Sequence, residues 1–171
     1  MAANTYTLIS SNVLASTATS VTFSSIPSTY TDLVLRTSTR TNTATGTGSM
    51  FITCNGTSAN YSQTLIAGNG STASSSRLGT QAQFDVLTEG TSYTASTFTN
   101  DELYVPSYLA SQNKPISFYN VIENNATAAA IRAYALLWQN TATITSITIA
   151  DATGGQFVAN SSFYLYGIKN S

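Results

Sequence analysis

The chain of 171 residues has no histidine, one cysteine and three prolines. The lack of histidine excludes Ser–His–Asp and Cys–His catalysis and removes the commonest metal ligand. The single cysteine, Cys54, cannot form an internal disulfide, and a zinc site would need more than one cysteine. We predict that Cys54 is a small buried apolar side chain, and we expect no metal and no cofactor.

Charged side chains are also scarce, at 8% of the residues, against roughly a quarter in a typical soluble domain. The formal net charge is −1, which leaves little repulsion between copies of the chain. Binding to nucleic acid needs a clustered basic face, whereas the six basic residues are spread along the chain, so we expect no nucleic-acid partner. These residues are Arg36, Arg40, Arg77, Lys114, Arg132 and Lys169.

Long apolar runs are missing as well. No run approaches the ~18 residues that a membrane-spanning helix needs, so we expect no membrane partner. The first residues, MAANTYTLISS, lack the basic start and the apolar centre of a secretory signal. We therefore expect synthesis in a cytoplasm without export.

Serine and threonine, about three residues in ten, take the place of the missing charge. The hydrophobic share of 42% and the aromatic share of 11% suffice for a packed core, and threonine favours strands. The length predicts a single domain over residues 1–171. Residues 1–5 are either a flexible arm that orders on a partner or a frayed end.

The clearest local pattern lies in residues 19–40, TSVTFSSIPSTYTDLVLRTSTR. Val21 and Phe23 are two apart, as are Leu33 and Leu35, so each pair puts apolar side chains on one pleated face. A proline between the two pairs ends the first strand. The pattern predicts two strands joined as a hairpin by a polar turn.

Asn-Gly signals organise the next part of the chain. The first one follows a strand over Met50–Cys54 and precedes a strand over Tyr61–Ala67, which predicts a second hairpin. The second one is followed by the Ser-rich tract Ser71–Ser76, which we interpret as a connection to a strand over Leu78–Glu89.

A long aromatic connection runs from Glu89 to Asn113, and such connections are often functional. The alternative is that Glu102–Val105 is a short strand whose aromatic residues belong to the core. Three tyrosines of this connection, Tyr93, Tyr104 and Tyr108, are our candidate interface residues, because tyrosine anchors interfaces and stacks on sugar rings.

Two further segments carry apolar residues at strand spacing. In the first, Ile116 and Phe118 face one way and Tyr119 and Val121 the other, as in a strand covered on both sides. Residues 126–139 are ambiguous, because their Ala and Leu content favours a helix. We favour a strand there, because strands flank it on both sides.

Roughly nine to eleven short strands, with turn signals every 8–12 residues, are typical of a sandwich or barrel. We predict an all-β fold, an antiparallel two-sheet β-sandwich of jelly-roll type.

The seven carboxylates give little sign of catalysis. Asp101 and Glu102 are the only adjacent pair, and neighbours on an extended chain point to opposite faces, so they cannot flank one glycosidic bond. A pair from distant positions, such as Asp85 with Glu123, stays open. We expect that the protein is not an enzyme.

Three stretches, TYTLISS, SVTFSSIPSTYTDLVLRTSTR and ITSITIADATGGQFVANSSFYLYGIKNS, resemble a diffuse family of virion surface proteins of tailed bacteriophages. The matching motifs are Tyr6–Ile9, Ile26–Arg36, Trp138 with Ile144–Ile149, and Leu165–Lys169. The resemblance leaves residues 41–113 uncovered, and its motifs contain no catalytic residue.

The resemblance implies a structural virion protein on the capsid exterior, made in the host cytoplasm. As a capsid decoration (cement) protein it would bind the major capsid protein, as a homotrimer, and stabilise contacts between capsomers. The alternative is a tail or fibre head that binds a receptor or a glycan.

Overall fold

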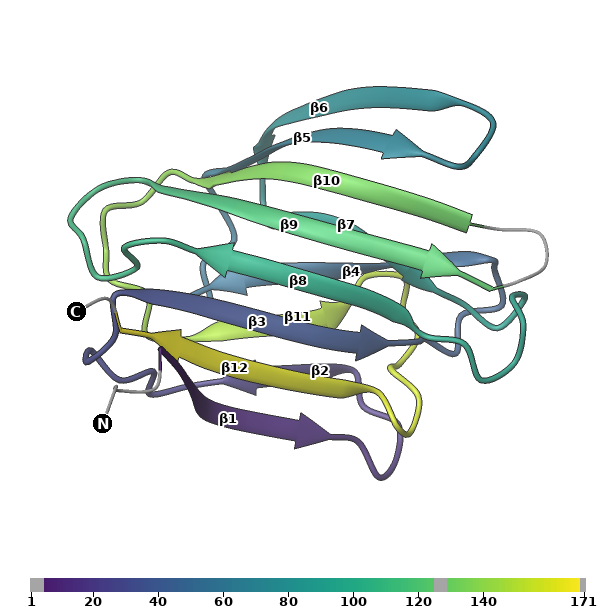
Figure 1. The fold of residues 1–171 in the computed structure, drawn as a ribbon, viewed down its shortest axis with the longest axis horizontal. Coiled ribbons are helices and arrows are strands. Elements are labelled where there is room, and N and C mark those ends of the chain that lie inside the picture. The colour runs from purple at the N-terminus through teal and green to yellow at the C-terminus, as the bar shows by residue number, and fades with distance from the viewer. Residues whose placement is uncertain (1–4, 125–128, 170–171) are drawn as a thin grey trace.

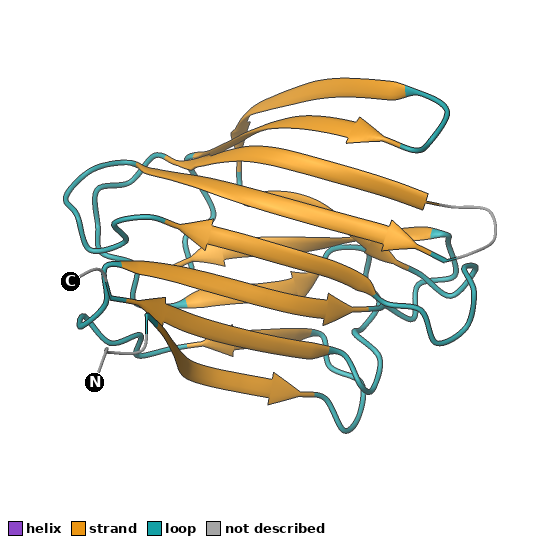
Figure 2. Ribbon diagram, viewed as in Figure 1, coloured by secondary structure: helices purple, strands orange, loops and turns teal. Residues whose placement is uncertain are grey.

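In the computed structural model, which describes residues 5–124 and 129–169, the chain forms two antiparallel β-sheets that face each other, with no helix in the described residues (Figures 1 and 2). The strands are β1 (Tyr6–Val13), β2 (Ser20–Phe23), β3 (Asp32–Thr39), β4 (Thr47–Cys54), β5 (Tyr61–Gly68), β6 (Ala73–Gln81), β7 (Phe84–Glu89), β8 (Thr99–Val105), β9 (Lys114–Glu123), β10 (Ala129–Trp138), β11 (Ile147–Asp151) and β12 (Ser162–Ile168). The predicted all-β fold with two antiparallel sheets is confirmed.

The two sheets differ in size. The larger one has eight strands in the order β1-β12-β3-β8-β9-β10-β5-β6, and the smaller one has four in the order β2-β11-β4-β7. A jelly roll has eight strands in two Greek keys, and the division into eight and four strands does not confirm that part of the prediction.

The core lies between the sheets and follows from strand alternation. Leu35 and Phe118 face inward from the large sheet, and Met50 and Ile52 face inward from the small one, each at most 2% exposed. Burial of one such side chain stabilises the fold by about 1.5–3 kcal/mol. Trp138, at the end of β10, is fully buried.

The predicted hairpin over residues 19–40 is wrong, although both of its strands exist. β2 belongs to the small sheet and β3 to the large one, so the chain crosses from one layer to the other between them. Each strand has a buried apolar face, and the two faces meet across the core instead of lying side by side. Ile26 fixes the crossing, because it is buried and its N–H donates to the carbonyl of Thr145.

The second predicted hairpin is wrong for the same reason. Asn55 and Gly56 do form a tight turn with positive φ angles of 52° and 63°. However, β4 pairs with β7 and β11 in the small sheet, whereas β5 pairs with β6 and β10 in the large sheet. The turn residues predict where the chain reverses direction, but they do not predict which of the two sheets the next strand joins.

Two segments interpreted as connections contain strands. Most of the Ser-rich tract belongs to β6, an edge strand that is exposed along almost its whole length. The long aromatic connection contains β8, in the middle of the large sheet, so the alternative of a strand over 102–105 is confirmed.

The ambiguous segment 126–139 is a strand from Ala129 to Trp138, and its first residues lie outside the described part of the chain. The predicted arm over residues 1–5 also lies outside it except for Thr5, whose carbonyl accepts a hydrogen bond from the N–H of Lys169.

One expectation about β9 is corrected. Ile116 and Phe118 are buried, but Tyr119 and Val121 on the opposite face are 54% and 41% exposed. The single chain covers this strand on one side only, because the small sheet packs against one face of the large sheet.

Candidate protein interaction surface

Among residues 5–124 and 129–169, no group of three or more His, Cys, Asp or Glu side chains could hold a metal ion. In the same residues, no helix is long and apolar enough to cross a membrane. The carboxylates of Asp85 and Glu123, which the sequence left open as a pair, come from strands of different sheets.

The outward side of the large sheet carries most of the exposed apolar side chains. We call it the outer sheet face. Of the eight large hydrophobic side chains exposed in the described chain, strand register places seven on it, each between 41% and 65% exposed. These are Tyr6, Leu8, Val13, Ile66, Tyr119, Val121 and Ile131. Large exposed apolar patches of this kind mark interaction sites.

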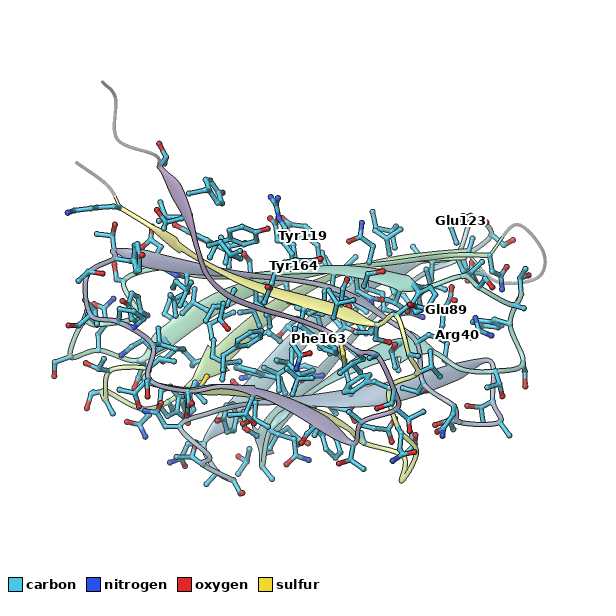
Figure 3. The ribbon with its side chains drawn as sticks, turned by 90° about the horizontal axis from the view of Figure 1, so that it is seen from below. Arg40, Glu89, Tyr119, Glu123, Phe163 and Tyr164 are labelled. Atoms are coloured by element: carbon cyan, nitrogen blue, oxygen red, sulfur yellow. The ribbon has the colours of Figure 1, made fainter. Side chains whose placement is uncertain are left out.

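A row of neighbouring side chains crosses the middle of this face. The register aligns Tyr164, Arg36, Glu102 and Tyr119 on four adjacent strands. In Figure 3, Tyr119 and Tyr164 lie on the outer side of the large sheet, whereas Phe163 lies between the two sheets. The row lies between two groups of exposed or partly exposed side chains. Val121 of β9 and Ile131 of β10 are on one side of it, and Tyr6 of β1 and Tyr166 of β12 are on the other.

The two charges in this row neutralise each other. Arg36 Nε donates to Glu102 Oε2 at 2.8 Å, and the Arg36 guanidinium carbon lies 5.9 Å from the ring centroid of Tyr6. The Tyr6 ring in turn packs edge-on against Tyr166 at 6.4 Å. The centre of the face therefore presents aromatic and aliphatic groups with no net charge.

The face carries two hollows. A hollow of about 410 Å³ is lined by Arg36, Glu102, Tyr119 and Val121, among others. Next to it, Val121 and Ile131 line a second hollow of about 230 Å³. The broad extent of this apolar surface, over several strands, suits a folded protein partner.

The three candidate tyrosines do not share one surface. Tyr104 lies on the outer sheet face, and its hydroxyl donates to Asp32 Oδ2 at 2.9 Å. Partial burial and the neighbouring Asp32 carboxylate raise the pKa of Tyr104. Tyr93 does not lie on a strand of the large sheet but in the β7–β8 connection, where it is partly exposed.

Tyr108, the third candidate interface residue, does not lie on the surface of the single chain. Its side chain is fully buried in the core, and its hydroxyl donates to the carbonyl of Pro27. An aromatic residue in a connection can fill the end of the core as readily as it can face a partner, and sequence spacing does not distinguish the two cases.

Tyr119, Val121 and Ile131 were not singled out from the sequence. For Tyr119 and Val121, the available signal was the pattern of apolar residues on both faces of residues 114–123, which we interpreted as a strand covered on both sides. No family model, curated protein or solved structure matches the chain. The phage resemblance therefore stays a prediction.

Proposed function

We propose that this protein is a structural assembly subunit whose copies associate through the outer sheet face. One observation carries the proposal: seven of the eight exposed large hydrophobic side chains lie on that face. Water contact with so many apolar groups on one surface is unfavourable, and a protein partner would remove it.

The chemistry of the face favours a second copy of the chain as its occupant. Its central charges, Arg36 and Glu102, already form a pair within the chain, so a partner needs no matching charge. The whole chain carries a net charge of −1, which opposes self-association little.

The resemblance supports a more specific role. In this proposal the oligomer is a homotrimer that acts as a capsid decoration (cement) protein on the outside of a phage capsid. It binds the major capsid protein and holds neighbouring capsomers together. Binding to the assembled shell and not to its separated parts would stabilise the shell by mass action.

The association step can be tested with a matched pair of variants. Val121, on the outer sheet face, and Leu78, on β6 outside it, are both 41% exposed. We expect the wild type and Leu78→Asp to run as trimers in light scattering at micromolar concentration, and Val121→Asp to run as a monomer. A monomeric wild type, or equal behaviour of the two variants, would overturn the proposed interface.

The capsid role needs a separate measurement, namely copy number in purified particles. Hundreds of copies per particle support a decoration protein, whereas a few to a few dozen would place the chain in the tail. Val121→Asp should fail to add back to particles stripped of this protein, and Leu78→Asp should bind them.

A further inference from the structure

A cleft opens at one end of the sandwich, next to the outer sheet face. In Figure 1 the β5–β6 hairpin extends past the small sheet at this side of the molecule. The cleft has a volume of about 440 Å³ and is lined by Tyr93, Arg132, Asn69, Ser71, Ile122 and Ala130, among others. We call it the end cleft. A smaller hollow of about 130 Å³ shares three of these residues, Asn69, Ala130 and Arg132.

Arg132 is held in the cleft by a buried polar chain. It lies on the inward side of β10, opposite Asn120 of β9, and its Nη1 donates to Asn120 Oδ1 at 3.1 Å. Asn120 is fully buried and donates from Nδ2 to Asp101 Oδ1 at 2.6 Å and to the carbonyl of Leu87 at 2.9 Å. These bonds fix the amide, which in turn orients the guanidinium.

Most of the guanidinium remains available for a ligand. An arginine side chain has five N–H donors, and within the described chain Arg132 uses one of them in a hydrogen bond. Both salt bridges of the described chain belong to other arginines, Arg36 and Arg40. Arg132 is therefore a cation at a concave surface without a bonded carboxylate.

Tyr93 is positioned by a second buried network. The carbonyl of Tyr93 accepts a hydrogen bond from Arg40 Nη2 at 3.0 Å, and the carbonyl of Thr94 accepts one from Nη1 at 2.8 Å. The ring lies against Gly46, where a Cβ atom would come within 2.6 Å of Tyr93 Cε1. The backbone of Tyr93 is thus fixed by Arg40, and its ring packs on a surface that only glycine leaves open.

We propose that the end cleft binds a sugar that carries a carboxylate, of the uronic acid or sialic acid class. The Tyr93 ring would stack on the apolar face of the sugar ring, and the Arg132 guanidinium would bind the carboxylate in the bidentate geometry that arginine favours. Asn69 and Ser71, in the β5–β6 turn, supply an amide and a hydroxyl for the hydroxyl groups of the sugar.

The size and charge of the cleft favour this class of ligand. Its volume lies in the range of small-molecule sites, about 300–1,000 Å³. Arg132 is the one basic residue among the described residues that line it, which suits a single carboxylate. A nucleic acid would need several basic groups along its backbone. The end cleft adjoins the outer sheet face, because the hollow lined by Val121 and Ile131 shares Asn69, Ile122 and Ala130 with it. The inference nevertheless rests on other residues than the proposed association, because Tyr93 and Arg132 do not line that hollow.

The test uses sodium glucuronate as the probe and glucose as its match without the carboxylate. Binding to the full chain is followed by saturation-transfer NMR and by titration calorimetry. We expect glucuronate to saturate the wild type at millimolar concentration and glucose to bind at least tenfold more weakly. Arg132→Gln and Tyr93→Ala should each weaken glucuronate binding at least tenfold.

Matched controls separate a local effect from a loss of fold. Tyr119→Ala removes an exposed tyrosine from the outer sheet face and should leave glucuronate binding unchanged. Arg132→Lys keeps the charge and should restore part of the affinity that Arg132→Gln loses. Thermal unfolding of each variant shows whether the fold is intact.

Three outcomes would overturn the inference. The first is no saturation of the wild type by glucuronate or N-acetylneuraminate at tens of millimolar. The second is equal binding of glucose and glucuronate, unchanged in Arg132→Gln. The third is binding that survives Tyr93→Ala but is lost in Tyr119→Ala, which would move the ligand to the outer sheet face. None of these three outcomes changes the result expected in the association test.

Discussion

Arg40 and Glu89 form a buried ion pair, with 3.3 Å between Arg40 Nη1 and Glu89 Oε2 and side chains that are 8% and 0% exposed. Figure 3 shows both residues between the two sheets at one end of the sandwich. The pair joins the segment after β3 to the end of β7. Arg40 Nη1 and Nη2 also donate to backbone carbonyls of the β7–β8 connection, including those of Thr97 and Tyr93.

Replacement of Arg40 by Met should therefore destabilise the fold strongly. The change leaves the Glu89 carboxylate buried without its cation and frees the carbonyls of the connection, and loss of one partner of a buried pair costs about 3–5 kcal/mol. Urea unfolding measures the free energy. Glucuronate binding should weaken as well, because Tyr93 loses its anchor.

The control for this variant is Arg36→Met. Arg36 also pairs with a glutamate, Glu102, but their side chains are 54% and 43% exposed, and an exposed pair contributes at most about 1 kcal/mol. If the two substitutions cost the same free energy, the Arg40–Glu89 pair does not have the structural role assigned to it.

Asp101 should make the stability of the fold depend on pH. Burial raises the pKa of its carboxyl to about 7, although hydrogen bonds from Asn120 and Thr37 and the charge of Arg132 act in the opposite direction. The folded protein therefore holds this proton more tightly than the unfolded chain, whose carboxyl has a pKa near 4. The stabilisation is complete below about pH 4 and is lost as pH rises to about 7.

Asp101→Asn should remove this dependence. We expect the wild type to be less stable at pH 8 than at pH 5 by about 2–3 kcal/mol from this group, and we expect the variant to lose most of that difference. Urea unfolding at the two pH values gives the comparison. Asp85, whose pKa burial also raises, stays in both proteins, so its contribution cancels. An unchanged difference in the variant would contradict the assignment to Asp101.

Gly167 on β12 is expected to tolerate no side chain. A Cβ atom there would lie 2.3 Å from Tyr30 Cγ, whereas a Cβ atom on Gly68 of β5 would meet nothing within 4 Å. Gly167→Ala should cost about 1–3 kcal/mol, because the Tyr30 ring must move in a packed region. Gly68→Ala should be neutral or slightly stabilising, since alanine restricts the unfolded chain more than glycine. Thermal melts of the two variants decide the point, and equal melting temperatures would contradict it.

The sequence predicted the strands better than their partners. Alternation at Val21 and Phe23, or at Leu33 and Leu35, identifies the buried face of a strand, and that face is the same in a hairpin and in two opposed sheets. Whether two such strands form a hairpin or lie in opposed sheets depends on contacts with residues distant in the sequence, such as the hydrogen bond from the Ile26 N–H to the Thr145 carbonyl. The first part of β6 was missed because its serine-rich sequence has no apolar alternation and the strand is exposed along almost its whole length.

The candidate surfaces were harder to predict than the fold. Strand spacing placed Tyr119 and Val121 on a shared face, but only the finished sheet shows that the small sheet leaves this face uncovered. The end cleft brings together Tyr93 and Arg132, which are 39 positions apart (132 − 93) and carry no motif. Tyr108 was misplaced because a tyrosine in a connection has no periodic neighbours that reveal its direction.

Cys54 should resist thiol reagents as long as the protein is folded. Burial raises the pKa of its thiol to about 12, and the charge of Lys114 offsets only part of that rise. The thiolate is the reactive form, so at pH 8 it is nearly absent and the buried sulfur is also shielded from the reagent. We expect dithionitrobenzoate to release almost no colour from the native protein in an hour and one equivalent per chain in 8 M urea. Rapid reaction of the native protein would mean that the sandwich opens around β4 on that timescale, and the rate measured against urea concentration would then report the free energy of that opening.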